Sequence, residues 1–161
     1  MRKIYSLPFD LFHKLPSLEC LVVQNCFGLR EIFPSQKLQV HDKVLATLKQ
    51  LFLLNLKELE SIGLEHTWVQ PYSQKLESLR LHFCPRLQNL VSCAPSLINL
   101  KELEVMYCDQ MEYLFTFTTA KSLVKLETLI VTNCESIKKL QNMKMKMIVM
   151  KLYVHNSDRL S

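Results

Sequence analysis

Two glutamates come closest to a catalytic pair in this sequence. Glu102 and Glu104 stand two positions apart in a predicted strand, so their carboxylates would share one face at a separation of about 7 Å. This arrangement superficially resembles a paired-carboxylate site. The five histidines offer no obvious third member, because they are scattered at positions 13, 41, 66, 82 and 155. We expect no catalytic activity and no small-molecule substrate.

The six cysteines are the other residues whose chemistry could define a site. No two of them have the C-x-x-C spacing typical of zinc sites, and the chain has no Asn-x-Ser/Thr glycosylation acceptor. We therefore expect free thiols in a reducing compartment, with no metal and no other cofactor. The cysteines are Cys20, Cys26, Cys84, Cys93, Cys108 and Cys134.

The charge distribution argues against several classes of partner. The net charge is +5, but residues 1–137 carry equal numbers of basic and acidic side chains, so the whole excess lies in the last 24 residues. A neutral body lacks the basic face of a nucleic-acid-binding protein. Two glycines cannot form a phosphate-binding loop, and no apolar run reaches the ~18 residues of a membrane helix. For the basic end we favour a solvated segment over contact with anionic lipid.

An irregular repeat supplies the elements that would position these residues. The frame L-x-x-L-x-L-x-x-C-x-x-L-x-x-L starts near positions 18, 48, 76, 100 and 126, and a degraded sixth copy starts near 149. Residues 141–161 form a degenerate basic end. The intervals lie in or close to the range of about 20–29 residues that is typical of leucine-rich repeats. We expect residues 1–161 to form one domain of five to six repeats.

The spacing within each copy predicts a strand and a bend. Residues two apart leave the same face of a strand, so each L-x-L pair would point inward, and stacked copies would bury a continuous core. The fold class predicted is an α/β leucine-rich-repeat solenoid, with a curved parallel sheet on the concave face and loops and short helical turns on the convex face. Helical turns are expected near residues 44–49 and 121–125. The inward pairs are Leu21/Val23, Leu51/Leu53, Leu79/Leu81, Leu103/Val105 and Leu129/Val131.

Cysteine in the ninth position of the frame has a structural explanation. A small thiol there can turn inward and donate to loop carbonyls that would otherwise be unpaired. We expect buried free thiols at Cys26, Cys84, Cys108 and Cys134, with Leu56 interrupting the series. Cys20 and Cys93 fall outside this position and are the expected reactive thiols.

The outward residues of the third and fourth strands are the expected binding surface. In the repeat register Arg80 lies beside Glu104, so an ion pair explains that carboxylate better than catalysis does. Phe83 and Tyr107 replace the asparagines found at the same position of the other copies. Their rings either anchor an interface or pack against adjoining loops. The expected protein-binding residues are Arg80, His82, Phe83, Glu102, Glu104, Met106 and Tyr107.

The copies LESLRLHFCPRLQNL, LKELEVMYCDQMEYL and LETLIVTNCESIKKL, from Leu76 to Leu140, resemble a known family. They are similar to the C-terminal leucine-rich repeats of plant intracellular nucleotide-binding immune receptors of the coiled-coil type. The resemblance implies a cytoplasmic role in recognising a pathogen effector or a guarded host protein, and in autoinhibition through the receptor's nucleotide-binding domain. The nucleotide-binding G-x-x-x-x-G-K-[ST] string is absent from this chain.

A ubiquitin-ligase substrate adapter is the alternative within the same architecture. Adapter repeats also place cysteine after L-x-L, but they usually continue with an Ile-Thr-Asp-like turn and keep a steadier period. This chain instead continues with Pro-Arg-Leu, Asp-Gln-Met and Glu-Ser-Ile. Because the outer repeats lack polar caps, we also expect the chain to be a fragment of a larger receptor.

Overall fold

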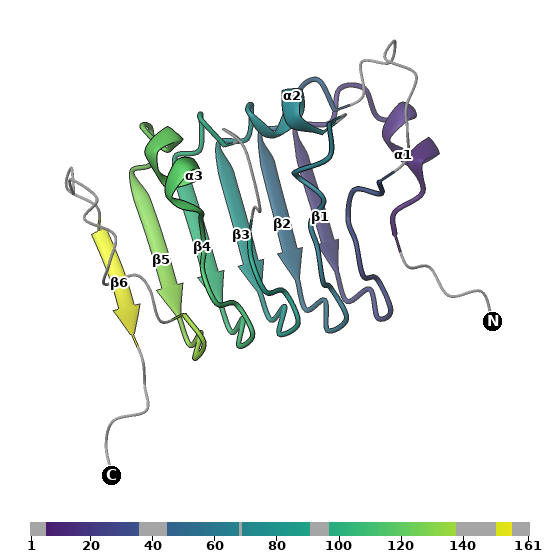
Figure 1. Ribbon diagram of the computed structural model, residues 1–161. Helices are drawn as coiled ribbons and strands as arrows, with labels where there is room; N and C mark the ends of the chain where they lie inside the picture. Colours follow the sequence, from purple (N-terminus) through teal and green to yellow (C-terminus); the bar gives the residue numbers. More distant parts are fainter. Residues whose placement is uncertain (1–5, 36–44, 68, 91–96, 138–150, 156–161) are drawn as a thin grey trace.

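The computed structural model describes residues 6–35, 45–67, 69–90, 97–137 and 151–155. Six strands form one parallel sheet in chain order, β1 to β6, and each strand lies beside its sequence neighbours (Figure 1). This arrangement is the predicted leucine-rich-repeat solenoid. The strands are β1 Cys20–Gln24, β2 Gln50–Leu54, β3 Ser78–His82, β4 Glu102–Met106, β5 Thr128–Thr132 and β6 Lys151–His155.

The register of the sheet confirms the repeat frame. Leu79 aligns with Leu51 on one side and with Leu103 on the other, and every predicted inward pair is buried in this way. The backbone of Leu152 aligns with Leu129, so the degraded sixth copy also contributes a strand. The leucines that follow each strand complete one apolar core, in which Leu56, Leu59, Leu87 and Leu90 are at most 2 % exposed.

Strands β2 to β5 begin with the same pattern of backbone hydrogen bonds. The Glu19 carbonyl accepts from the N–H groups of both Lys49 and Gln50, at 2.9 and 3.0 Å. The carbonyls of Lys49, Glu77 and Lys101 repeat this pattern toward the following strand. These residues therefore hold equivalent places in successive repeats, and with Glu127 they form what we call the charge row: Glu19, Lys49, Glu77, Lys101 and Glu127.

The side chains of the charge row alternate in sign and pair across repeats. Lys49 Nζ lies 3.6 Å from Glu19 Oε1, and Lys101 Nζ lies 2.7 Å from Glu77 Oε2. The hydrogen bond and the charge of Lys101 lower the pKa of Glu77, and those of Glu77 raise the pKa of Lys101. These pairs are solvent-exposed, so they order neighbouring repeats without adding much stability.

Each of the first five strands is followed directly by a residue with a left-handed backbone. The φ angles lie between 51° and 56°, and the N–H of each of the first four donates to the last carbonyl of the next strand, as Asn55 does to His82 at 2.8 Å. Asparagine tolerates this conformation better than other non-glycine residues. We call these five positions the strand-end column: Asn25, Asn55, Phe83, Tyr107 and Asn133.

Three short helices lie near the end of the sheet at which the strands begin (Figure 1). They are α1 Phe9–His13, α2 Gln70–Ser73 and α3 Phe117–Ser122. The helical turn predicted at 121–125 overlaps α3 only at residues 121 and 122, because the helix begins earlier, where the Thr116 hydroxyl accepts from the Thr119 N–H at 3.2 Å, and ends at Ser122. The turn predicted at 44–49 is not helical where it is described, because Leu45 has φ of 55°.

Two predicted features fall partly or wholly outside the described residues. These are the thiol of Cys93 and the degenerate basic end at 141–161 apart from the backbone of β6.

Candidate functional site

The candidate site is the concave face, which we define as the outward side chains of the strands together with the strand-end column. Along each strand these side chains alternate with the buried leucines and valines. All seven sequence-predicted binding residues lie on this face, on or directly after β3 and β4.

The Glu104 carboxylate lies near two basic side chains on the concave face. Arg80 Nε lies 3.3 Å from Glu104 Oε2, and His82 Nε2 lies 3.2 Å from Glu104 Oε1. Both oxygens of Glu104 therefore face basic groups of the neighbouring strand. The Arg80–Glu104 pair follows directly from the strand register, in which the two residues are aligned.

The concave face also carries apolar residues on either side of β3 and β4, which were not predicted. The guanidinium carbon of Arg80 lies 4.8 Å from the ring centroid of Phe52, in cation–π contact. Phe52 aligns with Val22, which is 49 % exposed, and Ile130 aligns with Glu104 on the opposite side. Comparing the outward position at the middle of every strand, rather than of β3 and β4 alone, would have found all three apolar residues.

The rings of Phe83 and Tyr107 stack on each other and face solvent. Their centroids are 4.5 Å apart and their planes differ by 4°, while Phe83 is 51 % and Tyr107 42 % exposed. The rings are thus not buried under adjoining loops. We call these two residues the aromatic pair.

Other members of the strand-end column behave differently. Asn55 Nδ2 donates to Asn25 Oδ1 at 2.6 Å. Asparagine at these positions therefore tolerates the left-handed backbone and also forms a hydrogen bond with the next asparagine of the column. Phe83 and Tyr107 have φ of 56° and 54°, a conformation that is uncommon for bulky residues. Backbone strain of this kind is typical of functional positions.

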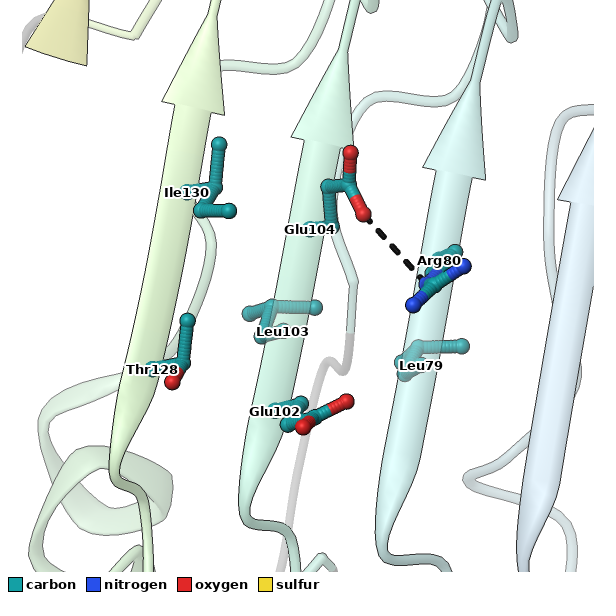
Figure 2. A pocket seen from close by; sticks show the side chains of 7 residues that line it. All are labelled: Leu79, Arg80, Glu102, Leu103, Glu104, Thr128 and Ile130. Carbon is teal, nitrogen blue, oxygen red and sulfur yellow. Dashed lines mark ion pairs between the residues drawn. The ribbon is translucent and has the colours of Figure 1, made fainter. Parts of the chain in front are cut away.

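A shallow hollow of about 180 Å³ lies between β3, β4 and β5 (Figure 2). Arg80, Glu102, Glu104, Thr128 and Ile130 surround it, above the backbone of Leu79 and Leu103. Of the two carboxylates in the hollow, Glu104 faces Arg80, whereas Glu102 accepts a 3.4 Å hydrogen bond from the Ser78 hydroxyl and no other from the residues described. The Glu102 carboxylate is therefore open to solvent and to a partner.

Three buried thiols lie behind the strand ends and form what we call the cysteine ladder: Cys84, Cys108 and Cys134. Their burial confirms the prediction, but each thiol donates a weak hydrogen bond to a carbonyl within the preceding strand, not to a loop carbonyl as predicted. The acceptors are Leu53 for Cys84 at 3.8 Å, Leu81 for Cys108 at 3.7 Å and Val105 for Cys134 at 3.8 Å.

The prediction for Cys26 was wrong, because its thiol is exposed. Cys26 follows β1, the edge strand of the sheet; among the described residues no earlier strand offers a carbonyl, and the Cys26 sulfur donates to the Gln24 carbonyl at 3.4 Å. Cys20 is partly exposed, as its outward position predicted.

Contacts within the cysteine ladder also set its acidity. For Cys108, the hydrogen bond with Cys134 lowers the pKa, but the bond with Cys84 and burial outweigh it and raise the pKa to about 12. The hydrogen bond with Cys108, together with burial, raises the pKa of Cys134. The bond with Cys108 lowers the pKa of Cys84 against the effect of burial.

Among the described residues, no three His, Cys, Asp or Glu side chains are grouped as metal ligands. In the same residues, no helix is long and apolar enough to cross a membrane.

The stacked parallel strands, the inward leucine pairs and the cysteine ladder define a leucine-rich-repeat protein. The family model for plant disease resistance protein RPS2-like leucine-rich repeats matches residues 2–109 and 94–135. The chain therefore belongs to this family and is a repeat module of the kind found in plant resistance proteins. No curated protein and no solved structure matches the chain significantly.

Proposed function

We propose that this chain is the protein-recognition module of a plant immune receptor acting in the cytoplasm. In this proposal its concave face contributes to recognition of a pathogen effector or a guarded host protein. Contact with the nucleotide-binding domain of the same receptor contributes to autoinhibition. Leucine-rich repeats generally mediate protein–protein contacts through such extended surfaces, and the matching family consists of disease-resistance repeats.

The aromatic pair is the observation that carries this proposal. Two half-exposed rings stand where other repeats have asparagine, in a backbone conformation that favours asparagine. Exposed aromatic residues beside an arginine are typical of interface residues that dominate binding energy. Packing of the domain does not require them, so a partner surface is the better explanation.

Binding without catalysis is part of the same proposal. Glu104 is the more enclosed of the two carboxylates on β4, and its oxygens face Arg80 and His82. Both oxygens are thus directed at side chains of the neighbouring strand rather than at the open hollow.

Affinity capture from plant leaf extract, with and without a pathogen, tests the proposed function. We compare the wild-type chain with a Phe83→Ala/Tyr107→Ala variant and with Phe27→Ala, a matched control that removes a 67 % exposed ring outside the aromatic pair. Recovery of a nucleotide-binding domain or a pathogen protein by wild type and control, but not by the double variant, supports the proposal. Recovery of ligase scaffold subunits by the wild type would favour the adapter alternative.

A further inference from the structure

Among the outward side chains that the structure describes, negative charge exceeds positive charge on the concave face. Among the described outward side chains of the strands, two carboxylates, Glu102 and Glu104, stand against one guanidinium, Arg80. Arg80 already faces Glu104 and the Phe52 ring. The charge left unbalanced is therefore that of Glu102.

Neighbouring cations do not neutralise Glu102. Lys101, which precedes it, places Nζ 2.7 Å from Glu77 in the charge row. Lys125 donates to Asn99 Oδ1 at 2.6 Å. Within the described part of the chain, Glu102 has the Ser78 hydroxyl as its hydrogen-bond donor, so its remaining acceptor sites face the hollow and solvent.

The other walls of the hollow suit the stem of a long basic side chain. Ile130 and Thr128 line the hollow from β5, whereas the Glu102 carboxylate points from β4 toward β3 (Figure 2). Lysine and arginine bury their methylene stems against apolar groups while the charged end keeps a polar partner. A carboxylate is the preferred acceptor for either charged end.

We propose that this hollow binds a lysine or arginine side chain of a protein partner, while an apolar residue of the same partner segment packs on the aromatic pair. The inference rests on the proposed function, because it takes the concave face as the binding surface. It also specifies the chemistry of the partner, which would present a segment with one basic side chain and one apolar side chain.

The spacing of the two points follows from the geometry of β4. Met106, the last residue before Tyr107, lies four positions after Glu102, which is about 13 Å at the rise of a strand. An extended segment lying along β4 would span this distance with its basic and apolar side chains about four positions apart. Polyanionic partners such as nucleic acid or acidic lipid would be repelled by Glu102.

Selection of random linear peptides on the full chain tests the proposal, with the Phe83→Ala/Tyr107→Ala variant as counter-selection. We expect the enriched peptides to share a lysine or arginine about four residues from an aromatic or aliphatic residue. Binding of one synthetic consensus peptide is then measured by calorimetry at low and high salt. Glu102→Gln should weaken binding about tenfold at low salt, with a smaller effect at high salt.

Glu112→Gln is the matched control, since it removes an equally exposed carboxylate outside the concave face and should leave affinity unchanged. Enriched peptides without a basic residue, or binding that Glu102→Gln does not weaken, would overturn the proposed cation site. Loss of the same binding in the aromatic double variant would leave the proposed function standing. A selection that enriches no peptide would also overturn the cation site, and the capture experiment would then decide the proposed function separately.

Discussion

The rings of Phe83 and Tyr107 lie parallel, 4.5 Å apart, on two consecutive left-handed residues of the strand-end column. A left-handed backbone costs about 1–2 kcal/mol for an ordinary residue. A stacked aromatic pair returns about 0.5–1.5 kcal/mol. Because both residues bear this cost, about 2–4 kcal/mol together, the aromatic pair is unfavourable for folding, and its presence is better explained by binding.

Replacing both rings with asparagine should separate stability from binding. Phe83→Asn/Tyr107→Asn would restore the residue type seen at the equivalent positions of the other repeats and relieve the strained backbone. We expect urea denaturation to show a fold at least as stable as wild type, with partner binding weaker by ~2 kcal/mol or more. The alanine double variant should lose binding equally while its melting temperature changes little. Unfolding of either variant would show that the rings belong to the core.

A charge in the core should abolish folding, whereas the same charge on the concave face should not. Leu81 is fully buried in β3, so Leu81→Asp would bury an unpaired carboxylate. Val22 is 49 % exposed on β1, and Val22→Asp makes the matched change in a strand without burial. Circular dichroism should show a folded protein for Val22→Asp alone. A cooperative melt for Leu81→Asp would contradict the repeat register.

Alkylation should distinguish the exposed thiols from the cysteine ladder. With iodoacetamide under native conditions, peptide mass spectrometry should find Cys26 and then Cys20 modified first. Cys84, Cys108 and Cys134 should react only after urea is added, because their sulfurs are buried. Native modification of Cys134 at the rate of Cys26 would mean that the strand ends open readily.

The cysteine ladder should also make the fold sensitive to alkali. An ordinary thiol with a pKa of 9.0 loses its proton in the unfolded chain above that pH, whereas folded Cys108 keeps its proton to about pH 12. The folded state then binds more protons, so the free energy of unfolding should fall as pH rises through this window. Cys134 acts in the same direction, and Cys84, with its lowered pKa, opposes it.

Urea titrations at pH 7 and above pH 9 measure this alkaline effect. A Cys108→Ala/Cys134→Ala variant should be less stable than wild type at neutral pH, since it loses packing and two weak hydrogen bonds. It should lose less stability on going to alkaline pH. An equally steep decline in the variant would assign the effect to other groups.

The strands and the Arg80–Glu104 pair could be predicted because the L-x-L spacing aligns every residue of one repeat with its counterpart in the next. Contacts between neighbouring repeats at different positions could not be read in this way. The exposure of Cys26 depends on β1 having no preceding strand, which a shared frame does not reveal. Helices α1 and α2, at five and four residues, are too short to show helical periodicity.

The left-handed backbone of the strand-end column was not predicted, for a different reason. Glycine normally marks such a conformation, but here the marker is asparagine at Asn25, Asn55 and Asn133. The replacement of these asparagines by Phe83 and Tyr107 was evident in the sequence, but the left-handed φ that makes the replacement costly was not.

The charge row has a consequence for how such a chain can gain or lose repeats over evolution. The core leucines are interchangeable between repeats, so they do not distinguish one neighbouring repeat from another. The charge row does distinguish them, because its charges alternate in sign. Duplicating or deleting one repeat would place like charges of this row side by side. Duplicating or deleting two repeats together would preserve the alternation. Unequal recombination in this part of the gene should therefore be tolerated more readily in pairs of repeats than in single ones.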